Sequence, residues 1–154
     1  MKKILLLGAA MMLTLACAGQ VGAQEDRGYW QPASSSAHAI TGAIDISETK
    51  VIIDFATFPL AKIRRLKPVE VSAVFDADVN AGIEGTLYRL NVPPAQRFEH
   101  KNTLCGGEAT QWMATYVTGR TLSVAFFSGD DTPLFTFDAM QNSPTICGTF
   151  VYGR

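Results

Sequence analysis

The clearest structural signal in the chain is the run of residues 111–128, QWMATYVTGRTLSVAFFS. Two segments, 111–118 and 121–128, flank Gly119 and Arg120, and a two-residue loop with glycine first is typical of a type II′ hairpin turn. So short a loop sets the pairing register and places Thr118 opposite Thr121. The sequence therefore predicts an antiparallel β-hairpin of known register.

This register sorts the side chains of the hairpin onto two faces. The first face is apolar enough to be core and pairs Met113 with Phe126, Thr115 with Val124 and Val117 with Leu122. The second face groups Trp112, Tyr116 and Phe127. If it is uncovered, it forms an apolar patch of the kind that contacts a ligand or partner; if residues 24–38 or 58–75 cover it, it is a second core layer. We predict these three residues as contact residues, and both alternatives remain open.

Further strands are predicted on either side of this hairpin. Alternation or β-branched runs mark residues 39–46, 51–55, 86–92, 134–138 and 146–152. Residues 58–75 break the β pattern, and we expect a helix at 69–76, with Glu70 in its first turn, and room for one helical turn before it. The predicted fold is mainly β: a small antiparallel barrel or sandwich of about seven strands with one or two short helices.

The N-terminus has the pattern of a secretory signal peptide. Lys2 and Lys3 precede an uncharged apolar run at 4–16, and small residues lead to Ala23. We expect a signal peptide at 1–23, although Ala18 also suits cleavage. An irregular lead-in at 24–38 and a single β domain at 39–154 would follow. These features predict a periplasmic or secreted protein.

Cys17 offers a second interpretation of the same segment. It could be the lipidated cysteine of a bacterial lipoprotein, and of the three residues before it Ala16 fits that pattern. The protein would then be attached to a membrane through Cys17, whereas under the first interpretation it is not.

Removal of residues 1–23 changes both the charge and the cysteine count. The 154-residue chain carries 13 basic and 14 acidic residues, and the remaining 131 residues carry 11 and 14, a net charge of −3. This balance argues against a nucleic-acid-binding protein. Cys105 and Cys147 are left as a pair, and in an oxidising compartment they predict a disulfide.

The strongest metal-binding pattern is Asp76, Asp78 and Asn80, which reads D-x-D-x-N-x-G up to Gly82. Alternate oxygen ligands suit calcium, although Ala81 stands where an EF-hand loop has glycine, and a turn after a helix is the alternative. The basic residues at 62–67 could contact an anionic partner or form a solvated face.

Two segments, 102–107 (NTLCGG) and 146–150 (ICGTF), resemble the paired Cys-Gly segments of uncharacterised small exported bacterial proteins. The resemblance implies export, a disulfide and a small β fold. His38 and His100 belong to no catalytic signature, so no catalytic residue is predicted.

Together these features predict a non-catalytic binding module for a small apolar ligand or a protein partner. The alternatives are a structural envelope-associated protein, in particular a lipoprotein, and, third, a small hydrolase.

Overall fold

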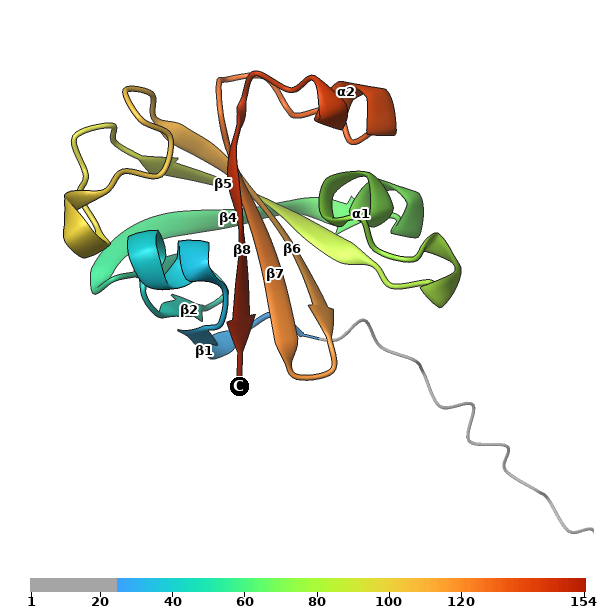
Figure 1. Cartoon of the computed structure of the whole chain (residues 1–154), viewed down its shortest axis with the longest axis horizontal. Helices are drawn as coiled ribbons and strands as arrows, with labels where there is room; N and C mark the ends of the chain where they lie inside the picture. Colours follow the sequence, from blue (N-terminus) through green and yellow to red (C-terminus); the bar gives the residue numbers. More distant parts are fainter. Residues whose placement is uncertain (1–24) are drawn as a thin grey trace, which may run out of the picture.

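Eight antiparallel strands follow one another around a closed barrel in the computed structural model, which describes residues 25–154 (Figure 1). The strands are β1 (Gly28–Pro32), β2 (Ile44–Ile46), β3 (Lys50–Ile53), β4 (Ala56–Leu66), β5 (Gly85–Val92), β6 (Thr110–Thr118), β7 (Thr121–Ser128) and β8 (Ile146–Gly153). Pairing of β1 with β8 closes the barrel. The mainly β prediction is confirmed, as a barrel rather than a sandwich. The predicted signal peptide and Cys17 lie outside the described residues.

The β6–β7 hairpin has the predicted register. Thr118 pairs with Thr121, and the register holds as far as Trp112 and Phe127. Gly119 has a φ of 60°, the left-handed value that a type II′ turn requires at its first central residue. A bulge then shifts the pairing, so that Thr110 rather than Gln111 lies opposite Ser128. The short turn therefore fixes the pairing up to that bulge.

Among the described residues, five short helices lie in four of the connections between strands. They are η1 (Ala37–Thr41), α1 (Pro68–Phe75), η2 (Val79–Ala81), η3 (Glu99–Lys101) and α2 (Phe137–Gln141). The predicted helix is α1: the side chain of Glu70 accepts a hydrogen bond from the Lys67 backbone N–H at 2.8 Å. It ends at Phe75 because Asp76 takes a left-handed conformation. Figure 1 shows α1 and α2 on one side of the barrel and η1 on the other.

Within the segment 58–75, expected to break the β pattern, the part before the helix was predicted wrongly, because residues 58–66 are strand rather than a turn of helix. β4 is the longest strand, with 11 residues. Its pairing with β5 shifts between Lys62 and Arg64, and this bulge leaves Ile63 exposed. With the extra residue of the bulge, the apolar residues Leu60, Ile63 and Leu66 are three positions apart. This spacing resembles the period of a helix although the segment is a strand.

Three further boundaries differ from prediction. The lead-in at 24–38 is not irregular throughout, because β1 lies within it and Trp30 is fully buried. The strand expected at 39–46 begins only at Ile44, since the backbone N–H of Gly42 bonds to the Ala37 carbonyl and closes the π-helical turn η1. Residues 134–138 are not a strand: Thr136 caps α2 by accepting a hydrogen bond from the Ala139 backbone N–H.

Large side chains fill the inside of the barrel. The buried cluster there includes Trp30, Met113, Phe126, Phe150 and Tyr152, each no more than 1% exposed. An eight-stranded barrel is just wide enough to be filled in this way. A second cluster lies between the outer face of the sheet and the α1–α2 side.

The predicted disulfide between Cys105 and Cys147 is present. It joins the loop before β6 to β8, and both residues pack against the interior cluster. The bridge spans 42 residues. In the chain-entropy model a loop of this length stabilises the fold by roughly 4 kcal/mol.

Candidate functional site

The aromatic face of the β6–β7 hairpin lies on the outside of the barrel and is covered. Trp112 is 6% exposed and Phe127 is fully buried, whereas Tyr116 is half-buried. The ring of Phe75, in α1, lies 4.9 Å from that of Tyr116, and the ring of Phe135, before α2, lies 5.8 Å from that of Phe127. Of the two alternatives, a second core layer therefore describes Trp112 and Phe127, and Tyr116 is the member nearest to solvent.

Polar neighbours hold the indole of Trp112 in place. Its Nε1–H donates to the Gly129 carbonyl at 3.1 Å, and the Arg89 guanidinium lies 4.4 Å from the ring centre. Arg89 also donates to the side chain of Gln111 and to the Asp130 carbonyl. These contacts join β5, β6 and the loop after β7, so the Trp112 ring is held where these three segments meet.

An open groove lies beside this layer, between α1 and α2. Its volume is about 510 Å³. Its floor includes Ser123, the cross-strand partner of Tyr116, and Val151 of β8. Its walls include Val74 and Phe75 from α1 and Phe137 from α2. Polar residues, among them Asp76 and Thr149, also line it, so the groove has a mixed lining and borders the predicted aromatic face.

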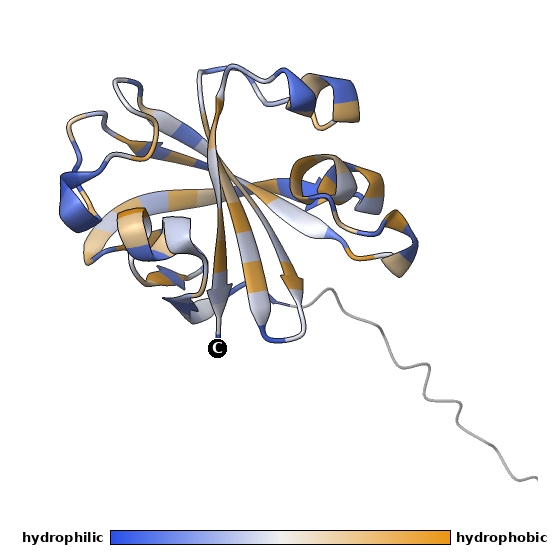
Figure 2. Cartoon of the chain, in the orientation of Figure 1, coloured by the Kyte–Doolittle hydropathy of each residue, from blue (hydrophilic) through white to orange (hydrophobic). Residues whose placement is uncertain are grey.

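Exposed apolar side chains surround the α1–α2 side of the molecule. Phe137 is 61% exposed, Leu134 72% and Val69 61%. Figure 2 shows apolar positions on both helices as well as on the strands beneath them. Single exposed apolar residues are ordinary, but Phe137 lines the groove and keeps its ring open to solvent. Its exposed ring therefore offers an apolar contact surface at the wall of the groove.

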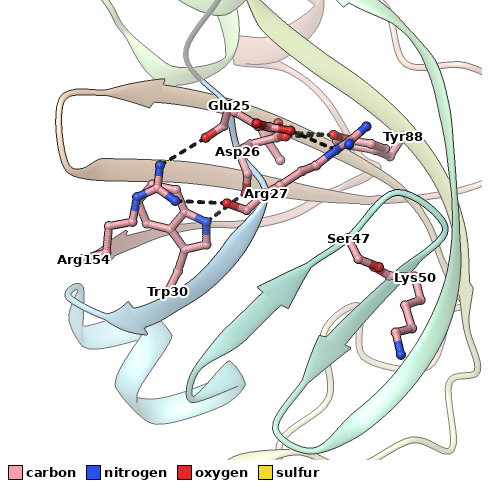
Figure 3. A network of polar contacts seen from close by, with 9 residues as sticks. Glu25, Asp26, Arg27, Trp30, Ser47, Lys50, Tyr88 and Arg154 are labelled. Atoms are coloured by element: carbon pink, nitrogen blue, oxygen red, sulfur yellow. Dashed lines mark hydrogen bonds and ion pairs between the residues drawn. The ribbon is translucent and has the colours of Figure 1, made fainter.

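A buried acid, Asp26, lies in a network of polar contacts close to the C-terminal residue Arg154 (Figure 3). Asp26 is 7% exposed, and its carboxylate accepts hydrogen bonds from the hydroxyls of Tyr88, at 2.9 and 3.0 Å, and Thr115. Trp30 donates to the Asp26 carbonyl, and the Arg154 guanidinium lies 4.0 Å from the Trp30 ring. Burial and the nearby Asp26 charge raise the pKa of Tyr88. The network therefore satisfies the hydrogen-bonding capacity of the buried acid.

The predicted calcium residues form turns. Asp76 ends α1, and Asp78 Oδ1 accepts hydrogen bonds from the backbone and side-chain nitrogens of Asn80 at 2.9 and 3.1 Å. Across residues 25–154, no group of three or more His, Cys, Asp or Glu side chains is placed to hold a metal ion. Each of the three residues therefore has a role in forming these turns.

Ion pairs occupy half of the basic residues at 62–67. Arg64 pairs with Glu70 at 2.8 Å, and Arg65 pairs with Glu84 at 2.7 Å. The hydrogen bond from Arg64 lowers the pKa of Glu70 and raises that of Arg64. This pairing reduces the charge available to an anionic partner and favours the solvated-face alternative.

The α2 wall of the groove was missed because residues 134–138 were expected to form a strand. A signal was present: Thr136 is a good N-cap residue, and Asp138 lies in the first helical turn. The apolar and aromatic residues Leu134, Phe135 and Phe137 favour a strand, and the strand prediction was based on them.

Comparison with known proteins returned no matching family model, no matching curated protein and no matching solved structure. None of the helices between residues 25 and 154 has the length and apolar character needed to cross a membrane.

Proposed function

We propose that this chain is a non-catalytic binding module, exported to the periplasm or secreted, that binds an apolar ligand in the groove between α1 and α2. The observation that carries the proposal is the contrast between the two apolar regions. The barrel interior is filled by its own side chains, whereas the groove outside it stays open beside an exposed Phe137.

Size and lining both support a small apolar ligand. A volume of about 510 Å³ lies within the usual range of small-molecule sites, roughly 300–1,000 Å³. The lining combines apolar walls, Val74 and Phe137, with polar groups that would orient a ligand, among them Ser123, Thr149 and Asp76. Binding would bury the exposed ring of Phe137, and each Å² of apolar surface removed from water contributes about 25 cal/mol.

A fluorescence titration with 1-aminoanthracene, a neutral apolar probe, tests the proposal. We expect saturable binding by the chain without residues 1–23, and an affinity at least fivefold lower for Phe137→Ala. Leu134→Ala is the matched control, because it removes an apolar side chain of similar exposure that does not line the groove. Equal affinities for both variants and the wild type would contradict the proposal.

The same probe separates a small-molecule ligand from a protein partner. Extracts of the native host's envelope, divided into small-molecule and protein fractions, should compete with 1-aminoanthracene. Competition from the small-molecule fraction supports the proposal. Competition confined to the protein fraction would instead assign the groove to an apolar side chain of a partner.

A further inference from the structure

The outer face of β1, β2 and β3 carries a second hollow, on the η1 side of the barrel. The strand register places Tyr29, Asp45 and Ile52 side by side on this face. The hollow has a volume of about 310 Å³, and Asp54 and Glu99 also line it. It shares no lining residue with the α1–α2 groove, so it is a separate site.

Two aromatic side chains border this hollow and remain open to solvent. Phe55 is 96% exposed and Tyr29 is 58% exposed. Both belong to the lining, Tyr29 from β1 and Phe55 from the turn between β3 and β4. Exposed ring faces attract a cation and pack on the alkyl chain that carries it.

Three half-buried carboxylates share the hollow without a cation. Among the described residues, the ion pairs lie elsewhere, and the carboxylates of Asp45, Asp54 and Glu99 make no hydrogen bond. A methyl group placed on Gly42 would lie 3.3 Å from Glu99 Oε1 and 3.6 Å from Asp54 Oδ1. Two negative groups therefore converge over one glycine, and His38 is the one basic residue among those that line the hollow.

We propose that this hollow binds the side chain of an arginine or lysine from a protein partner. The carboxylates of Asp54 and Glu99 would bind the cationic head, and Tyr29 and Phe55 would pack against its alkyl stem. An organic cation fits better than a metal ion, because no described group of three acidic, His or Cys side chains is placed to hold a metal. The whole domain would then contact an apolar group on one side and a basic partner on the other.

The test uses a fluorescein-labelled peptide of alternating glycine and arginine, with a glycine–glutamate peptide as its counterpart. Fluorescence anisotropy at low ionic strength should show binding of the arginine peptide, no binding of the glutamate peptide, and weakening as salt is added. The double variant Asp54→Asn/Glu99→Gln should bind at least tenfold more weakly, and Phe55→Ala about threefold more weakly. Equal binding of the two peptides, or an unchanged affinity of the double variant, would overturn the proposal.

A matched control separates a site from general charge attraction. Glu108→Gln/Asp131→Asn removes the same amount of charge from exposed positions outside the hollow. Retention of wild-type affinity by this control supports the site, whereas an equal loss overturns it. The melting temperature of Asp54→Asn/Glu99→Gln should not fall, since the change removes repulsion. A marked fall would assign the carboxylates a structural role and overturn the proposal.

Spermidine competition distinguishes the source of the cation. We expect spermidine to displace the arginine peptide only at concentrations well above the Kd of the peptide. Displacement at lower concentrations would identify a free polyamine as the ligand and overturn the assignment to a protein partner.

Discussion

Trp112→Ala should destabilise the protein by about 4 kcal/mol, because the indole is a packed part of the layer outside the barrel. Truncation of a buried tryptophan to alanine costs roughly 3–5 kcal/mol. Trp112 is 6% exposed and lies among Leu87, Phe127 and Phe135. Loss of the contact with Arg89 adds about 0.5–1 kcal/mol. Loss of the hydrogen bond to the Gly129 carbonyl adds little to this cost, because Gly129 is exposed and its carbonyl can bind water instead.

Urea unfolding followed by far-UV circular dichroism measures this loss without depending on the deleted fluorophore. With an m-value of about 2 kcal/mol/M, the midpoint should fall by about 2 M. Trp112→Phe keeps most of the packing and should lose only about 1–2 kcal/mol. A loss below 1 kcal/mol in Trp112→Ala, with an unchanged m-value, would refute the reasoning. The indole would then contribute little to packing, and a ligand-contact role would become the better explanation.

Three further predictions concern the barrel and its ends. Asp26→Ala leaves the hydroxyl of Tyr88 without its acceptor and should cost about 2–4 kcal/mol in the same urea assay; a loss below 1 kcal/mol would contradict a stabilising role for this buried network. Burial raises the pKa of Tyr88 and Tyr152 above the unfolded value, so stability is complete below about pH 10 and should fall above it by about 1.4 kcal/mol per pH unit for each tyrosine. Tyr88→Phe should remove about half of that slope, and an unchanged slope would count against burial as its cause. Reduction of the Cys105–Cys147 disulfide should cost roughly 4 kcal/mol, seen as a lower melting temperature in dithiothreitol; equal melting temperatures would contradict a stabilising bridge.

The fold was predictable where local chemistry fixes it. Gly119 and Arg120 set the register of the clearest structural signal in the sequence, and Cys105 and Cys147, the pair that remains once the expected signal peptide is excluded, predicted the bridge. β1 could not be found in this way, because Trp30 is buried by long-range pairing with β2 and β8 rather than by a pattern around it. β4 was hidden by its bulge, which changes the spacing of the apolar residues.

The candidate site was only half predictable for a related reason. The sequence grouped Trp112, Tyr116 and Phe127 correctly on one face, since the hairpin register determines that grouping. It indicated residues 58–75 as one candidate cover, and α1 lies within that range and contacts Tyr116. It missed the second cover, Phe135 before α2, because that segment was expected to be a strand. The groove exists only where these two covering elements leave a gap.

The central claim is tested most directly by measuring where an apolar ligand contacts the protein. Intermolecular NOEs between 1-aminoanthracene and the methyl groups of the protein measure this contact. We predict NOEs to Val74 and Val151, which line the groove, and none to Leu122 and Val124, which lie inside the barrel. NOEs to Leu122 and Val124 instead would place the ligand in the barrel interior and contradict the account.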